Sequence, residues 1–416
     1  MTRLLPPLLR EPEFRRFWVG QTISVFGDQV TALALPIVAV LQLGADPASM
    51  GLLTAAGLLP NLLFSLPAGV WVDRIHRRRR LMIAADVGRA AMIAVVPMAF
   101  ALGVLSLPLV YAVAFGVGTL SVLFMVAWST LLSTVAQRED YVSANALLNG
   151  SRSLSQVGGP SIGGILIQVV GAPIAVLADA LSFLGSAFFF GRIRAPDPPV
   201  EADPGSLREQ LTAGLRFMVS DPIVRPTLLS VATLNFFNFC FSALFILFAT
   251  RSLGVEPGVL GLALGSGAVG SVIGAVIASR VGRAIGFGPA YIVGLVLFPA
   301  PLILVPLASG LPMPFVLAML FASEFLAGMG VMILDINAGS MLIARYPERI
   351  RGRASGAFSF VNNGIRPIGA TVGGLLGAAF GVRETLLVVS VLQLAGLLWL
   401  VRTPIPRLRD LPDAAE

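Results

Sequence analysis

Residues 159–166 of this chain read GPSIGGIL, and residues 368–376 read IGATVGGLL. The two glycine pairs, at 163–164 and 373–374, are 210 residues apart. A second match, at an offset of 206 residues, joins DRIHR at 73–77 with SRVGR at 279–283. Because similarity at a fixed distance along a chain is the signature of internal repetition, the two matches predict two related halves.

The composition predicts that both halves lie in a membrane. The chain is 56% hydrophobic, only 12% of its residues are charged, and its mean hydropathy is +0.87. Soluble domains carry about 25% charged residues, so a soluble fold could not cover this much apolar surface. Apolar stretches of about 20 residues, enough for a membrane-spanning helix, recur from Phe17 to Leu400. We expect an all-α membrane protein with twelve transmembrane helices in two six-helix, pseudo-symmetric bundles.

Short polar breaks separate the expected helices. They cover residues 17–43, 49–72, 80–103, 108–135, 141–170, 173–192, 223–250, 257–279, 287–308, 312–343, 352–380 and 384–402. The first run is longer than the apolar core of a signal peptide, so we interpret it as a retained helix. The expected domains are an N-terminal six-helix bundle at 1–192, a cytoplasmic linker at 193–222 and a C-terminal six-helix bundle at 223–416.

The distribution of arginine predicts the orientation in the membrane. The net charge is +7, and all 29 strongly basic residues are arginines. They lie in breaks between apolar runs rather than on one face, which argues against a nucleic-acid partner. Twenty-four fall on one side of the expected membrane, and only Arg251 and Arg383 fall on the other. The excess of arginine marks the cytoplasmic side, so we expect a multi-pass protein of a bacterial inner membrane with both termini in the cytoplasm.

Within the linker, Ser206 and Glu209 have the spacing of a capping box that begins a helix. Apolar residues then recur on one face of that helix, at Leu207, Leu211, Leu215 and Met218. This pattern predicts an amphipathic helix on the cytoplasmic membrane interface, and a solvated linker helix is the alternative.

The sequence contains none of the motifs of an enzyme. It has no cluster of metal ligands and no phosphate-binding loop, and its single cysteine, Cys240, lies inside an apolar run. We expect no catalytic activity, no cofactor and no metal, and a gradient as the source of energy. Six-plus-six repeats place a binding site near the bilayer midplane that is reached alternately from each side, which is a transport mechanism.

The segment GVWVDRIHRR at 69–78 resembles the loop signature of the major facilitator superfamily, G-x-x-x-D-R-x-G-R-R, with His76 in place of the usual glycine. The resemblance implies a cytoplasmic gate, formed by Gly69, Asp73, Arg74, Arg77 and Arg78. In this gate Asp73 would accept hydrogen bonds from the N-terminus of the eleventh helix, where the helix dipole favours a carboxylate. Alternatively, the arginines only set the topology.

Gly150, followed by Gly159, Pro160, Gly163 and Gly164, resembles the signature of antiporters in this superfamily. Small residues allow close helix contact, and the proline is expected to kink the helix near the central cavity. The resemblance favours export over uptake, with generic glycine packing as the alternative. The segments FRRFW at 14–18, GDQ at 27–29 and AADVGRA at 84–90 are similar to the branch that contains macrolide-type drug exporters and the enterobactin exporter.

Charged residues inside a membrane are costly, so each needs a partner, a cavity or a function. Five lie in helices that line the central cavity of the fold that the resemblance implies: Asp28, Arg152, Glu324, Asp335 and Arg366. Glu324 and Asp335 are three helical turns apart and share a face. We expect Asp28 and Glu324 to couple transport to protons, with Arg152 and Arg366 modulating them or binding anionic groups. Structural ion pairs are the alternative.

Two other groups of polar residues lie at membrane depth. Asp86 and Arg89 are spaced to pair along the third helix, and Asp179 has no evident partner in the sequence. Asn235 and Asn238 stand among phenylalanines and could line a weakly polar pocket for a hydrophobic drug, although ordinary helix packing explains them equally well.

Together these features predict a secondary active transporter that works by alternating access. We expect a proton-coupled exporter of hydrophobic drugs or siderophore-like metabolites, and a proton-coupled metabolite uptake carrier is the alternative. The expected partners are a small-molecule substrate, protons and membrane lipid, and the expected oligomeric state is a monomer.

Overall fold

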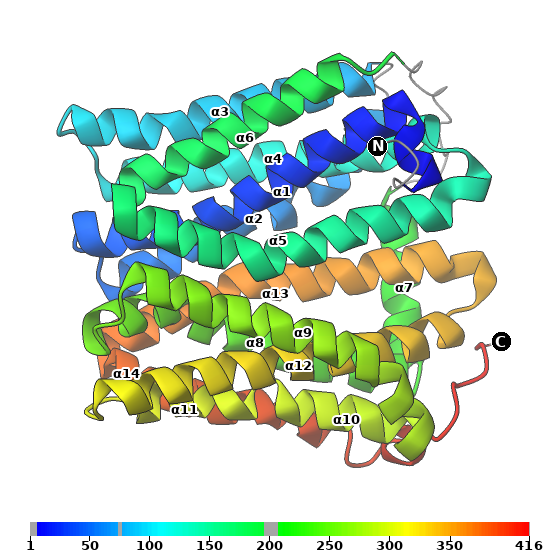
Figure 1. Cartoon of the computed structure of the whole chain (residues 1–416). Helices are drawn as coiled ribbons and strands as arrows, with labels where there is room; N and C mark the ends of the chain where they lie inside the picture. The colour runs from blue at the N-terminus through cyan, green and yellow to red at the C-terminus, as the bar shows by residue number, and fades with distance from the viewer. Residues whose placement is uncertain (1–5, 74–76, 195–206, 416) are drawn as a thin grey trace. The chain divides into compact units, whose positions relative to one another are not determined.

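The computed structural model describes residues 6–73, 77–194 and 207–415, and its regular elements in these ranges are helices (Figure 1). The N-terminal half contains α1 (Pro12–Ile37), α2 (Pro47–Asp73), α3 (Arg78–Ala101), α4 (Leu107–Val135), α5 (Tyr141–Val170) and α6 (Ala172–Gly191). The short helix α7 (Leu207–Ser220) follows. The C-terminal half contains α8 (Val224–Leu247), α9 (Pro257–Ile285), α10 (Phe287–Leu297), α11 (Leu304–Leu307), α12 (Met313–Arg345), α13 (Arg351–Phe380) and α14 (Val382–Leu392), which the 3-10 helix η8 (Gln393–Trp399) extends.

Ten helical segments among the described residues are long and apolar enough to cross a membrane. One of them, Phe287–Leu307, joins α10 and α11 through a 3-10 turn that contains Pro301. Helices α5 and α13 are 30 residues each and carry more polar side chains, including Arg152 and Arg366. With these two, the described chain has twelve helices of spanning length, which confirms the expected fold class.

The chain divides into two compact units. Unit 1 is Met1–Gly44, Ala56–Asp203 and Pro257–Gly261, and unit 2 is Ala45–Ala55, Pro204–Glu256 and Leu262–Glu416. Each unit is therefore built mainly from one half of the sequence, with one short segment from the other half. Helix α7 belongs to unit 2.

The internal repeat appears in the backbone at an offset of 210 residues. Short π-helical turns extend α1 at Val38–Gln42 and α8 at Phe248–Ser252. Glycines with positive φ end α5 at Gly171 (φ 83°) and α13 at Gly381 (φ 97°), a conformation that a side chain would strain. Since these irregular features recur at one spacing, the two halves share a backbone plan as well as a motif.

The second sequence match, at an offset of 206, differs by four residues from the spacing that the helices follow. Residues 279–283 lie inside α9, and the segment that they match, 73–77, contains residues 74–76, which lie outside the described residues. At the offset of 210 that the helices follow, Asp73 corresponds to Arg283. The short basic segments resemble each other because both lie near the end of a spanning helix, where arginine is common.

Helix boundaries differ from the expected ones by a few residues. Helix α1 begins at Pro12, five residues before the expected start, because a proline in the first turn costs no backbone hydrogen bond. The last spanning segment ends as a 3-10 helix at Trp399 rather than at residue 402.

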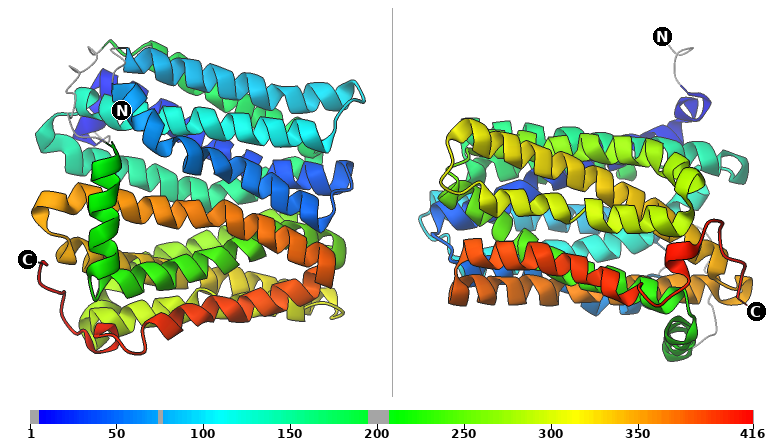
Figure 2. Two further views of the ribbon diagram at one scale, coloured as in Figure 1. Left: turned by 180° about the vertical axis from the view of Figure 1, so that it is seen from behind. Right: turned by 90° about the horizontal axis from the view of Figure 1, so that it is seen from below.

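The C-terminal part of the apolar face of α7 is covered by protein. Met218 is buried in a cluster with Val224, Leu342 and Ala357, and Figure 2 shows α7 crossing the ends of α8 and α13. A methyl group at Gly214 would lie 2.5 Å from the Arg353 carbonyl oxygen, so the backbones of α7 and α13 are in close contact. The described part of the amphipathic pattern, at Leu215 and Met218, therefore packs within unit 2, and the expected place at the membrane interface is still a prediction. The capping residue Ser206 lies outside the described residues.

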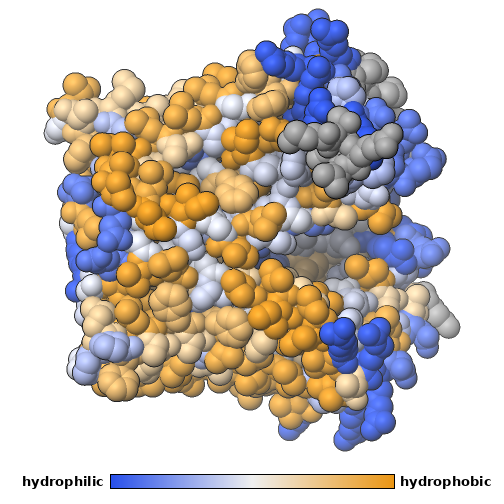
Figure 3. Space-filling view, viewed as in Figure 1, coloured by the Kyte–Doolittle hydropathy of each residue, from blue (hydrophilic) through white to orange (hydrophobic). Residues whose placement is uncertain are grey.

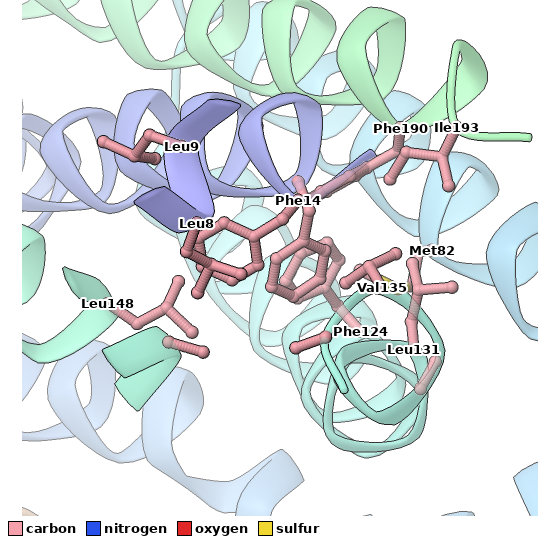
Figure 4. Packing of buried hydrophobic residues seen from close by; sticks show 14 of the residues in the cluster. Leu8, Leu9, Phe14, Met82, Phe124, Leu131, Val135, Leu148, Phe190 and Ile193 are labelled. Atoms are coloured by element: carbon pink, nitrogen blue, oxygen red, sulfur yellow. The ribbon is translucent and has the colours of Figure 1, made fainter. Parts of the chain in front are cut away.

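The core of unit 1 is an aromatic and aliphatic cluster at the N-terminal end of α1. Figure 4 shows Phe14, Phe124 and Phe190 pointing toward one another from α1, α4 and α6. The outward sides of the helices are also apolar, as in Figure 3, where hydrophilic residues gather at the helix ends. On α6, Leu177, Leu181, Leu184 and Phe188 are exposed at helical spacing. This distribution suits a lipid environment.

Candidate functional site

The strongest buried charge contact in unit 1 joins Asp86 and Arg89, one turn apart on α3. Their side chains are 0% and 3% exposed and form an ion pair, as their spacing predicts. The Arg89 guanidinium lies 4.2 Å from the ring centre of Phe183 and 4.4 Å from that of Phe124. Its Nη1 also lies 3.4 Å from the Ser121 hydroxyl. A cation between two aromatic faces and a carboxylate is held in place by both kinds of contact.

Asp28, on α1, is partly exposed and is close enough to Arg89 and Arg152 to feel both charges. The sequence placed Asp28 and Arg152 in the central cavity and Arg89 outside it. In the structure one guanidinium, that of Arg89, acts on both Asp28 and Asp86. The buried pair on α3 is therefore part of the same charged group as Asp28.

Asp179, on α6, completes this group. Its side chain is 1% exposed, and its Oδ1 lies 2.9 Å from the Ser182 hydroxyl. Its Oδ2 is buried and accepts no hydrogen bond from the described residues. A side chain at Gly27 would collide with the Asp179 carboxyl group, so this carboxyl packs directly against the backbone of α1 beside Asp28. Asp28 and Arg89 are its charged neighbours.

An apolar pocket of about 320 Å³ adjoins this group in unit 1. Residues of α1, α5 and α6 line it: Thr22, Ile23, Phe26, Gly27, Val30, Gly159, Ile162, Ala178 and Ser182. Ser182 contributes a hydroxyl both to this lining and to the contact with Asp179. The pocket is thus mostly apolar, with a polar connection to the buried carboxyl.

Glu324, in unit 2, has no charged group acting on it among the described residues. It lies on α12 where that helix crosses α9, and a methyl group at Gly267 would be 3.4 Å from its Oε2. A carboxyl at membrane depth without a cation is costly when ionised. The position therefore suits a group that binds a proton.

Asp335 and Arg366 lie close enough for their charges to interact, although they form no direct hydrogen bond among the described contacts. The Arg366 guanidinium lies 5.3 Å from the ring centre of Phe239. Asp335 is exposed, whereas Arg366 is half-buried between α13 and α8. The two expected cavity residues of α12 thus differ, since Asp335 has an arginine neighbour and Glu324 has none.

The two asparagines of α8 make polar contacts with different neighbours. Asn235 donates a hydrogen bond to Asn362 of α13 at 2.8 Å, and Asn238 points to Gln393 of η8 at 3.5 Å. Residues three apart lie on nearly the same side of a helix, so both side chains project from one broad face of α8, toward α13 and η8. These contacts fit ordinary helix packing, and the pocket for a hydrophobic drug is still a prediction.

The glycines of α5 make close contacts on two faces. A methyl group at Gly159 would lie 2.5 Å from the Gln29 Cβ on α1, and one at Gly164 would lie 2.5 Å from the Pro257 carbonyl oxygen. Gly163 packs against Val30. Gly150, in contrast, has nothing within 4 Å of an added methyl group, so packing does not explain the first glycine of the motif.

The expected gate is only partly described. Arg77 is exposed and Arg78 is buried. Arg74 and the Asp73 side chain lie outside the described residues, as do the surroundings of Gly69. The expected contact of Asp73 with the eleventh helix is therefore still a prediction.

Twelve spanning helices in two repeated halves, with charged groups buried among them, define a transporter of the major facilitator superfamily. The sequence profile of the family described as transmembrane secretion effector matches residues 3–415. The chain belongs to this family.

Two relatives that match along nearly the whole chain are named as efflux pumps. The multidrug efflux pump Tap of Mycolicibacterium fortuitum is 27% identical over 401 residues, which is 94% of this chain and 95% of that protein. Tap of Mycobacterium tuberculosis (strain ATCC 25618 / H37Rv) is also 27% identical, over 95% of this chain and 94% of its own. The solved nucleoside transporter NupG aligns with a TM-score of 0.76 over 94% of this chain and 99% of its own, at 13% identity, which shows the shared fold.

Proposed function

We propose that this transporter exports hydrophobic compounds from the cytoplasm and uses the inward flow of protons to do so. The observation that carries the proposal is full-length similarity to proteins named multidrug efflux pumps, over 94% of the chain in the first case. The antiporter-like glycine motif of α5 also favours export. Two of its glycines, Gly159 and Gly163, lie where α5 packs against α1.

Proton coupling is supported by carboxyl groups at membrane depth. In unit 1, Asp28 is partly exposed, and in unit 2 Glu324 has no cation among the described residues. We assign the coupling role to these two residues, one in each unit. Arg152 and Arg366, which lie near Asp28 and Asp335, modulate the charge of each site.

The proposed setting is the inner membrane of a bacterium, with both termini in the cytoplasm. The imbalance of arginines between the two sides supports this orientation. The proposed gate then faces the cytoplasm, and the transporter works as a monomer.

A susceptibility panel in an efflux-deficient bacterial host tests the proposal. Expression of the wild type should raise the inhibitory concentration of at least one hydrophobic antibiotic or dye about fourfold or more. Asp28→Asn should abolish this protection at equal expression, whereas Asp410→Asn, which changes an exposed carboxylate near the C-terminus, should keep it. A host that becomes more sensitive would indicate uptake, and unchanged protection by Asp28→Asn would refute its coupling role.

A further inference from the structure

The charges inside unit 1 do not balance. Away from the helix ends, its described charged groups are Asp28, Asp86, Arg89, Arg152 and Asp179. Three carboxyl groups thus share two guanidinium groups. Since an ionised carboxylate without a cation is costly in a membrane, one of the three is expected to carry a proton.

The geometry separates the roles of the three carboxyl groups. Asp86 has Arg89 as its direct ion-pair partner, so it is the carboxylate that stays ionised. Asp28 lies between the charges of Arg89 and Arg152. Asp179 has no direct cation partner among the described residues. Its Oδ1 accepts a hydrogen bond from the Ser182 hydroxyl, and its buried Oδ2 accepts no hydrogen bond from the described residues.

Asp28 and Asp179 are neighbours across the contact of α1 with α6. The absence of a side chain at Gly27 lets the Asp179 carboxyl reach the backbone beside Asp28. The charges of the two carboxyl groups act on each other, so they repel when both are ionised, and binding a single proton relieves that repulsion. The partly exposed Asp28 can exchange the proton with water, while Asp179 holds it out of contact with solvent.

We propose that Asp28 and Asp179 form a carboxyl pair that binds one shared proton, beside the buried Asp86–Arg89 ion pair. Asp179 is then part of the proton site of unit 1. Arg89 is a positioning residue, because its positive charge acts on both Asp28 and Asp179 and favours a pair that carries one negative charge. This proposal rests on the proposed function in one respect, since it identifies where the coupling proton binds.

The other polar groups around the site are neutral. The Thr31 hydroxyl lies near Asp179, and the Ser186 hydroxyl lies near Asp86. Neither hydroxyl has a hydrogen-bond partner that satisfies strict geometry among the described residues. Both can accept a hydrogen bond from a protonated carboxyl group, which an ionised carboxylate could not donate. Each hydroxyl can also donate to an ionised carboxylate, so both charge states of the site can be hydrogen-bonded.

Infrared difference spectroscopy of the purified full-length protein, titrated with acid and base without substrate, tests this directly. The wild type should show a carbonyl band of a protonated carboxyl group that disappears at high pH. Asp179→Asn and Asp28→Asn should each remove the same component of that band. The double variant should remove no more than either single change, because one proton is shared.

The controls separate folding from proton binding. Asp179→Glu keeps a carboxyl group, so the component of the carbonyl band that Asp179→Asn removes should be present again, at a shifted frequency. A merely structural role of Asp179 would not produce this result. Asp410→Asn should leave the spectrum unchanged, and Glu324→Gln should remove a different component. If the effects of Asp28→Asn and Asp179→Asn add, or if Asp179→Asn leaves the band intact, the shared-proton site is wrong.

Transport assays on the same variants keep the two proposals distinct. A shared carboxyl band in a protein that does not move compounds against a proton gradient would support the proton site and refute the proposed function. Proton-driven export that persists in Asp179→Asn would refute the inference and leave the proposed function standing.

Discussion

Arg89 is the residue on which the buried charges of unit 1 depend. It forms an ion pair with Asp86, lies between the rings of Phe124 and Phe183, and acts on the charges of Asp28 and Asp179. Lysine could not reproduce this set of contacts, because the flat guanidinium both stacks on rings and donates several hydrogen bonds.

Arg89→Gln should therefore destabilise the protein by about 3 to 5 kcal/mol, because it leaves the buried Asp86 carboxylate without its cation. The apparent midpoint of thermal unfolding in detergent, measured at one scan rate, reports this loss. Adding Asp86→Asn to the Arg89→Gln background should recover part of it. A single variant as stable as the wild type would show that the ion pair contributes little.

Asp46 illustrates an exposed carboxylate with a local role. Its Oδ1 accepts a hydrogen bond from the Ser49 amide at 2.7 Å, which caps the start of α2. This hydrogen bond lowers the pKa of Asp46 below its usual value of 3.8. Because the folded-state pKa is the lower one, the stabilisation is present above the unfolded pKa and is lost as the pH falls through the folded pKa.

Asp46→Ala should thus cost about 1 kcal/mol at neutral pH, and the difference from wild type should vanish in strong acid. Asp46→Asn keeps an oxygen that accepts the amide hydrogen bond and has no titration in this range. Its stability relative to Asp46→Ala should stay constant with pH. Thermal unfolding at several pH values measures the stability of the wild type, Asp46→Ala and Asp46→Asn. If the wild type gained stability over Asp46→Ala as the pH falls, the capping role of the Asp46 carboxylate would be contradicted.

At the scale of elements, the glycines of α5 mark the places where this helix packs closely against different neighbouring helices. Gly159 and Gly163 meet α1, and Gly164 meets the first turn of α9 within unit 1. The matching glycines of α13 repeat this plan within unit 2, where Gly374 meets Gly51 in the first turns of α2. Helix packing in membranes relies on such small residues because backbones can then approach closely.

Gly164→Ala should destabilise the protein by about 1 to 3 kcal/mol, because its methyl group would lie 2.5 Å from a backbone oxygen that cannot move freely. Gly150→Ala is the matched control on the same helix, with open space around the new methyl group. It should be neutral or stabilising by up to about 1 kcal/mol, since alanine favours a helix. Equal effects of the two changes on thermal unfolding would contradict the crossing.

The elements also show how far the sequence could predict the structure. Apolar length and the GPSIGGIL repeat were sufficient for the twelve helices and their duplication, because both signals are local. The match at an offset of 206 differs by four residues from the offset of 210 that the backbone follows, because short basic segments recur near helix ends for reasons of topology. Helix α7 was predicted from its apolar face, but one sequence could not say whether lipid or protein covers that face.

The candidate site was predicted in part. Asp28 could be found as a charge at membrane depth, and the Asp86–Arg89 spacing indicated a pair. Asp179 had no visible partner, because its contact with Gly27 joins residues about 150 positions apart and depends on the register between α1 and α6. The one available signal was the count of three aspartates against two arginines in the first six helices, away from the helix ends.

At the scale of the whole molecule, the arginine imbalance predicts which loops face the cell exterior. Cys240 is buried and is the only cysteine, so Cys240→Ala provides a background for single-cysteine labelling. In intact cells, a membrane-impermeant maleimide should label Ser106→Cys and should not label Ser220→Cys, although both positions are exposed. Labelling of Ser220→Cys alone would reverse the proposed orientation.

The most direct test of the central claim is transport in proteoliposomes under an imposed pH gradient of either polarity. A fluorescent hydrophobic compound identified in the susceptibility panel serves as the probe, and transporter molecules of one orientation are selected by blocking the other with the Ser106→Cys label. Movement of the compound opposite to the proton flow, lost in Asp28→Asn and kept in Asp410→Asn, is the predicted result. Movement in the same direction as the protons, or transport that ignores the gradient, would contradict a proton-driven exporter.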